Sequence, residues 1–273
     1  DASEDFQRVV EAWTAIRNAD PEEIDLCRSM ALLGVDPYDP DEATDSLVEL
    51  LTNLSTGLPS VLRNDLLEGS RADTLEAAAS WLSTTRAQLA NGTARHSYST
   101  LATSWAPSAH QTGYQFARKT RADLLGLGEK DTIEDLEGVM VERLGWDATP
   151  VRNVAQMNLL DGLIGLSTDN EKPVILDPGV RSGWGKRFLL ARSAFFTVTG
   201  TVDQGRLLTN AVTRPQRAAR AFAAELLAPA SALADRVGGL VSTDQVSELS
   251  EEFGVNPLLI QHQLENHHIG TVS

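Results

Sequence analysis

The sequence predicts an α+β protein that is mostly α-helical, in which a helical N-terminal half precedes a domain with a small three-stranded sheet. Two observations predict this fold class. Helix-start signals recur through the first part of the chain. In the second part, two short apolar segments flank a polar turn between stretches of helical spacing. We therefore expect a helical domain over residues 1–91, a linker rich in Ser, Thr and Ala over 92–108, and a second domain over 109–273.

Proline after a capping residue marks helix starts in the N-terminal half. Asp20-Pro21 and Asp39-Pro40 each place a side-chain acceptor before a proline at the first helical position, and glutamate follows in the first turn. Helices are expected to follow both signals and to end near Gly34 and Leu54. Two more helices are expected over about 58–67 and 72–90.

A β-hairpin is the central feature of the second half. Leu163–Leu166 and Pro173–Asp177 are apolar segments of strand length, and the polar stretch 167–172 between them has the composition of a turn. Val151–Met157 is expected to supply the third strand of the sheet. Pro173–Asp177 is expected to lie at its edge.

Predicted helices precede and follow this hairpin. One is expected over about 109–125, and another after Asp131, where Glu134 completes the pattern of a capping box. After the hairpin, helices are expected over Arg187–Val198 and about 215–227, the second of which is stopped by Pro229. Capping signals at Ser242 and Asn256 predict two more helices near the end of the chain.

Charge is distributed unevenly along the chain. The net charge of −15 argues against a surface that wraps nucleic acid as a whole. Residues 181–220, however, carry eight Lys or Arg and a single acid, so this basic window has a charge of +7 and the rest of the chain −22. One cysteine, Cys27, excludes an internal disulfide framework. Because no signal-peptide pattern is visible at the start and only one cysteine is present, we expect a cytoplasmic protein. No apolar run approaches the roughly 20 residues of a membrane span, so we expect no membrane partner.

Two segments of the second half together form a distinctive pattern. The first is Phe188-Leu-Leu-Ala-Arg192-Ser193-Ala-Phe-Phe196, and the second is Gln216-Arg-Ala-Ala-Arg220-Ala-Phe222-Ala-Ala-Glu225-Leu-Leu-Ala-Pro229. The pattern resembles the ImmA/IrrE family of bacterial zinc metallopeptidases, whose members read roughly RFxLAHExxH and then ExxANxFAAELLxP. The resemblance implies a zincin-like fold over about residues 109–270. It also implies relatives that cleave repressor proteins and so release stress or mobile-element genes.

The family's chemical residues are replaced in this chain. Arg192 stands at the position of the first zinc-binding His, Ser193 at that of the Glu, Phe196 at that of the second His and Gln216 at that of the third ligand. Zinc binds lone pairs on nitrogen, sulfur or oxygen, whereas arginine has only donors and stays protonated. Serine without a partner is too weak a base to activate water. We therefore expect neither a catalytic residue nor a metal ligand nor a cofactor at these positions.

The basic window suggests a different kind of site. Arg187, Arg192, Arg217 and Arg220 are candidates for an anion-binding or partner-binding pocket at the former metal site, because guanidinium groups suit phosphate and carboxylate. The alternative is that Arg192 pairs with an internal acid such as Glu225 while the other three arginines are solvated.

The histidines near the C-terminus leave a second alternative open. His262, Glu265, His267 and His268 lie close together in the sequence and are candidates for a relocated metal site. The competing interpretation is a polar helix end without a ligand.

Three functions follow from these patterns. The leading one is a catalytically inactive metallopeptidase-like protein that binds a protein or peptide partner, an acidic one suiting the arginines, in a bacterial stress, phage or mobile-element response. Its expected docking site is the strand Pro173–Asp177, by addition of a partner strand. The second is a sensor that binds a nucleotide or nucleic-acid phosphate at the arginines. The third is a hydrolase with a rebuilt site.

Overall fold

A computed structural model describes residues 6–10, 14, 18, 20–90, 98–102, 104–179 and 181–273. The predicted α+β class with mostly helical structure is confirmed. The chain divides into two compact units between Glu76 and Ala77, earlier than the expected boundary after residue 91. The reason is that the segment after Glu76 bonds to the second unit: Trp81 Nε1 donates to the carbonyl of Ala155 at 2.8 Å, and Ala90 N to that of Leu166 at 2.7 Å.

The first unit is helical, as expected. Asp20 caps its helix α2 by accepting a hydrogen bond from Glu22 N, and the helix ends at Gly34, whose φ of 74° favours glycine. Arg63 donates both terminal nitrogens to Asp25, each at 2.7 Å, and this pair ties α4 to α2. Residues 6–10 of this unit are helical, and its further helices are α2 (Pro21–Leu33), α3 (Asp45–Gly57), α4 (Ser60–Gly69) and the first residues of α5 (Leu75–Arg86).

The prediction of a helix start at Asp39-Pro40 was wrong. No helix follows Asp39-Pro40, because the Asp39 carboxylate accepts a hydrogen bond from Asp41 N and closes a tight turn instead. The helix begins at Asp45, and Thr44 caps it.

The expected linker over 92–108 is not a free connection where it is described. Its residues 92–97 and 103 lie outside the described residues. Elsewhere, Ser99 N donates to the carbonyl of Leu144 at 3.2 Å and Leu101 N to that of Val198 at 2.8 Å. Tyr98 is buried in the core of the second unit. These described residues are therefore part of the second unit.

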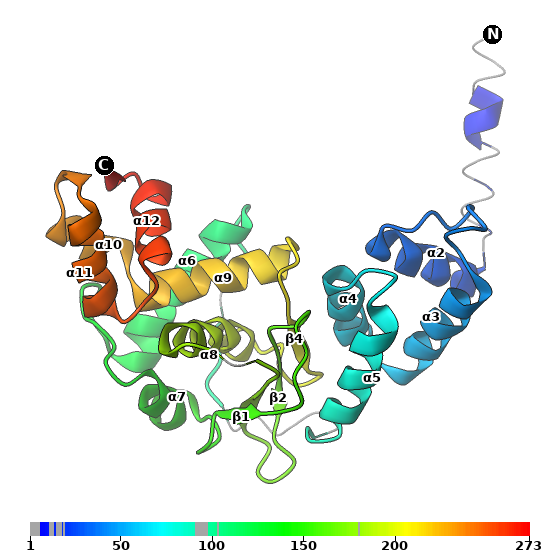
Figure 1. The fold of residues 1–273 in the computed structure, drawn as a ribbon, viewed down its shortest axis with the longest axis horizontal. Helices are drawn as coiled ribbons and strands as arrows, with labels where there is room; N and C mark the ends of the chain where they lie inside the picture. The colour runs from blue at the N-terminus through cyan, green and yellow to red at the C-terminus, as the bar shows by residue number, and fades with distance from the viewer. Residues whose placement is uncertain are drawn as a thin grey trace. The chain divides into compact units, whose positions relative to one another are not determined.

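A mixed sheet lies in the second unit (Figure 1), and its strand order is β1-β3-β2-β4. The predicted hairpin is confirmed as β2 (Gly162–Leu166) and β3 (Pro173–Asp177), which pair antiparallel. The third predicted strand, β1 (Val151–Asn153), is shorter than expected and pairs parallel with β3. A fourth strand, β4 (Arg206–Leu208), pairs with β2 and corrects the expected count of three. β3 is therefore an inner strand, so the expectation of an edge at Pro173–Asp177 was wrong.

The helices of the second unit largely follow the predicted ranges. Ser242 forms the expected capping box, and the Asn256 side chain caps the last helix. Asp131 was wrongly expected to start a helix: its carboxylate accepts from Gly128 N, and the helix begins only after Asp135. The elements are α6 (Ala109–Lys119), the π-helical η1 (Thr120–Leu125), α7 (Leu136–Leu144), α8 (Gly183–Val198), α9 (Arg214–Leu227), α10 (Ala230–Arg236), α11 (Thr243–Phe253), α12 (Pro257–Asn266) and the short pair β5 (Gly239–Val241) and β6 (Gly270–Val272).

An aromatic cluster centres the core of this unit. The Phe195 ring on α8 lies 5.8 Å from Phe116 on α6, 5.7 Å from Phe222 on α9 and 5.5 Å from Phe196. Gly113 lets α6 approach α9, because a Cβ at this position would lie 2.4 Å from the carbonyl oxygen of Ala218. These contacts fix α6, α8 and α9 against one another beside the sheet (Figure 1). Within the described part of the chain, no helix combines the length and apolar character that crossing a membrane requires.

Candidate functional site

Two of the four positions that match the family's zinc site meet in the structure. Arg192 on α8 is only 3% exposed, and its Nη2 donates to Gln216 Oε1 on α9 at 2.5 Å and to the carbonyl of Thr209. Its Nη1 donates to Asp161 Oδ2 at 2.7 Å. Gln216 in turn donates its Nε2 to the carbonyl of Leu207 at 2.6 Å. A buried network centred on a guanidinium thus occupies the junction of α8, α9 and the strand β4.

The other two positions, Ser193 and Phe196, are buried and offer neither an imidazole nor a carboxylate. Ser193 Oγ donates to the carbonyl of Leu189 at 2.8 Å, within its own helix. The guanidinium carbon of Arg206 lies over the Phe196 ring, 4.5 Å from the ring centre. Because two cationic guanidinium groups lie here and both terminal nitrogens of Arg192 are already bonded, these residues do not fit a zinc ion. The structure also gathers no group of three His, Cys, Asp or Glu side chains among the residues it describes.

Asp161 is the acid that balances Arg192, and sequence reasoning missed it. Arg192 does pair with an internal acid, as the alternative expected, but that acid is Asp161; Glu225, the example named, pairs with Arg118 instead. Asp161 precedes β2, which brings it to α8 although 31 positions separate it from Arg192. Burial lowers the pKa of Arg192, and the Asp161 carboxylate raises it again. Asp161 comes close to Arg192 only because β2 pairs with β4, and no local pattern in the sequence predicts that pairing.

The four candidate arginines do not form one site. Arg187 donates from Nη1 to the carbonyl of Glu134 at 3.0 Å and from Nη2 to that of Ile133. Arg192 lies in its buried network. The structure does bring together Arg217 and Arg220, which line the same groove on the surface of the second unit.

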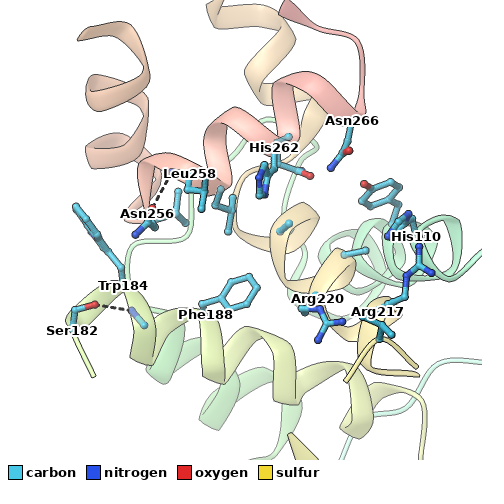
Figure 2. A pocket seen from close by; sticks show the side chains of 18 residues that line it. His110, Ser182, Trp184, Phe188, Arg217, Arg220, Asn256, Leu258, His262 and Asn266 are labelled. Atoms are coloured by element: carbon cyan, nitrogen blue, oxygen red, sulfur yellow. Dashed lines mark hydrogen bonds between the residues drawn. The ribbon is translucent and has the colours of Figure 1, made fainter. Parts of the chain in front are cut away.

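This groove has a volume of about 740 Å³ and lies between α8, α9 and α12, with the start of α6 at one end (Figure 2). Phe188 projects into it from α8, and His262 faces it from α12 (Figure 2). Trp184 and Leu258 lie at its other end and remain 41% and 55% exposed. Its lining is His110, Tyr114, Ser182, Trp184, Gly185, Phe188, Val212, Arg217, Arg220, Ala221, Ala224, Val255, Asn256, Leu258, Leu259, His262, Gln263 and Asn266.

The end of the groove near α6 is cationic. Arg220 is held in place by the carbonyls of Thr209 and Ala211, to which it donates at 3.3 and 2.8 Å. Burial lowers the pKa of Arg220; Asp161 raises it, and the adjacent Arg217 lowers it. Arg217 is exposed, and no hydrogen bond or ion pair joins its side chain to any residue that the structure describes.

A buried acid lies behind this end of the groove. Glu225 is 1% exposed and accepts from Arg118 Nε at 2.7 Å, Gln263 Nε2 at 3.2 Å and Ala230 N at 3.3 Å. His267 Nε2 lies 3.5 Å from Glu225 Oε2, the oxygen that also accepts from Gln263 and Ala230. His267 thus contacts Glu225, and it does not form a metal site with His262 and Glu265 among the residues described.

Acidification is expected to destabilise the fold through His267. Burial lowers the pKa of His267, Glu225 opposes this and Arg118 adds to it, so the folded-state pKa lies below the unfolded value of about 6.5. The unfolded state then binds more protons, and stability falls as pH drops through about 6.5 towards the folded pKa. Urea unfolding at several pH values should show a smaller acid loss in His267→Gln than in the parent. His110→Gln, at an exposed position, is the control, and an unchanged pH slope in His267→Gln would contradict the expectation.

Comparison with protein-family models and with curated proteins found no match to this chain.

Proposed function

We propose that this protein works by binding, and that the groove between α8, α9 and α12 takes up a segment of a partner protein. The groove itself is the observation that carries the proposal. Its volume of about 740 Å³ is of the size used for ligands, and apolar surface dominates its lining, while the two arginines lie toward one end. The exposed side chains of Trp184 and Leu258 offer apolar surface on which a partner's side chains can pack.

The network of Arg192 supports binding without hydrolysis. A zinc hydrolase needs lone pairs at the positions of Arg192, Phe196 and Gln216 and a base beside them. Here Arg192 and Gln216 bind each other, and Phe196 offers no lone pair. The resemblance of residues 188–229 to the ImmA/IrrE pattern supports a regulatory role for such a module in a bacterial stress, phage or mobile-element response.

A partner protein suits the groove better than a nucleotide or nucleic acid. A phosphate site built from the four arginines would need their guanidinium groups free, and Arg187 and Arg192 are both bonded to neighbours. The sheet edges are β1 and β4, so the docking by strand addition that Pro173–Asp177 suggested is replaced by docking between helices.

Retention of short random peptides by the pure protein tests the proposal. We expect the parent to retain a subset of the library and to return these peptides intact, as mass spectrometry would show. Ala224→Trp fills the groove from α9, and Leu258→Glu places a charge on its rim at the start of α12, where a carboxylate suits the helix dipole. Both variants should lose retention while keeping their circular dichroism. Cleavage of a retained peptide, or equal retention by both variants, would refute the proposal.

A further inference from the structure

Resting on the proposed function, we infer that the groove selects a partner segment in which an apolar side chain lies within a few residues of an aspartate or glutamate. The apolar side chain occupies the part of the groove beside Phe188, Trp184 and Leu258. The carboxylate binds between Arg217 and Arg220 at the other end.

The charge of the groove lining favours an anionic group in the ligand. The chain has 38 acidic residues against 23 Lys and Arg, so an average stretch of its surface is acidic. Among the described residues that line the groove there are two arginines and two histidines, His110 and His262, and no aspartate or glutamate. The groove is therefore complementary to an anion in a chain whose net charge is −15.

The surroundings of the Arg217 and Arg220 guanidinium groups favour a carboxylate as that anionic group. Arg220 is oriented by two backbone carbonyls, which fix its position without neutralising its charge. Its nearest acid, Asp161, is already shared between Arg192 and Arg181. Arg217 lies close enough to Arg220 to disfavour its charged form. A carboxylate bound between them would relieve this repulsion and receive charge-assisted hydrogen bonds from planar donors.

The arrangement of polar and apolar groups gives the spacing. Figure 2 shows Arg217 and His110 at one end of the groove, Trp184 and Ser182 at the opposite end, and the Phe188 ring between them. The floor on α9 consists of the small residues Ala221 and Ala224, which leave room for a side chain. A single small anion would use only one end of this space. A peptide that carries both an apolar and an acidic side chain fills both.

The composition of peptides selected from a random display library is the first test. The library is selected on the parent protein and depleted on Ala224→Trp. We expect Asp or Glu to be enriched within a few residues of Leu, Ile, Phe or Trp. Enrichment of apolar residues without acids would overturn this inference and leave the proposed function standing. Selection of nothing beyond what Ala224→Trp retains would overturn both.

Affinity measured by fluorescence anisotropy is the second test. A selected peptide, amidated at its C-terminus, is compared with its analogue in which Gln or Asn replaces the acid. Arg217→Glu should weaken binding of the acidic peptide roughly tenfold or more and affect the amide analogue far less, because charge-assisted hydrogen bonds are lost only in the first case. Lys186→Glu removes an exposed cation of the same basic window that does not line the groove, and should leave affinity unchanged.

Two results of this measurement would overturn the inference. One is an equal loss for the acidic peptide and its amide analogue in Arg217→Glu. The other is displacement of the acidic peptide by pyrophosphate or a short oligonucleotide at concentrations below the peptide's own dissociation constant, which would assign the cationic end to phosphate.

Discussion

Arg192→Leu is expected to lower the free energy of unfolding by about 3–5 kcal/mol, the usual cost of removing one partner from a buried ion pair. The substitution leaves Asp161, only 22% exposed at its side chain, without its closest cation. It also leaves Gln216 Oε1 and the carbonyl of Thr209 without their strongest donor in a buried place. Chemical denaturation followed by circular dichroism measures the effect.

Two further variants sharpen this result. Arg217→Leu changes an exposed arginine on the neighbouring helix and should shift stability by no more than about 0.5 kcal/mol. Asp161→Leu combined with Arg192→Leu should cost less than the two single changes together, with a coupling of about 0.5–3 kcal/mol. Additive costs would show that Arg192 acts through packing alone, and a loss below about 1 kcal/mol for Arg192→Leu would contradict the network as a cross-link between α8 and α9.

Glu225→Ala is expected to cost about 3 kcal/mol, because the buried donors Gln263 Nε2 and Ala230 N and the half-exposed Arg118 lose an acceptor at once. The carboxylate joins Arg118 on α6, Ala230 N at the start of α10 and Gln263 on α12, so α6, α9, α10 and α12 all depend on it. Hydrogen exchange would localise the effect: we expect α10 and α12 to exchange faster than the sheet.

Glu225→Gln is the matched control for that change. It keeps the size of the side chain and one acceptor oxygen, so its cost should be clearly smaller. The neutral amide no longer raises the pKa of His267, so the imidazole should titrate at a lower pH in this variant, as NMR would record. A pKa of His267 that stays the same in Glu225→Gln would contradict their interaction.

Local signals predicted much of this fold because they act over a few residues. The hairpin of β2 and β3 follows from two apolar segments around a polar turn, and the start of α11 from the reciprocal bonds of Ser242 and Gln245. Where one residue has two competing local uses, the prediction failed. Asp39 closes a turn, and Asp131 binds Gly128 N, although either side chain has the chemistry of a helix cap.

The features that the sequence did not predict depend on contacts between distant segments. β4 has three residues and no alternation, so only its pairing with β2 identifies it. The same pairing brings Asp161 to Arg192, which is why Glu225 was the wrong candidate partner. The cationic end of the groove was predicted in part: Arg217 and Arg220 lie one turn apart on α9, and helical spacing alone places them together.

Because the walls of the groove are helices, they would recognise a bound segment through side chains and hardly through backbone groups. Backbone amides and carbonyls within α8, α9 and α12 are largely bonded along each helix, so a ligand there meets few free backbone groups. The edge strands of the four-stranded sheet, β1 and β4, are each three residues long, and all three residues of β4 are buried, so neither offers a long edge for pairing with a peptide. Recognition by side chains discriminates between sequences, whereas strand addition tolerates many. On the proposed function, the groove would therefore distinguish between extended segments by their side chains.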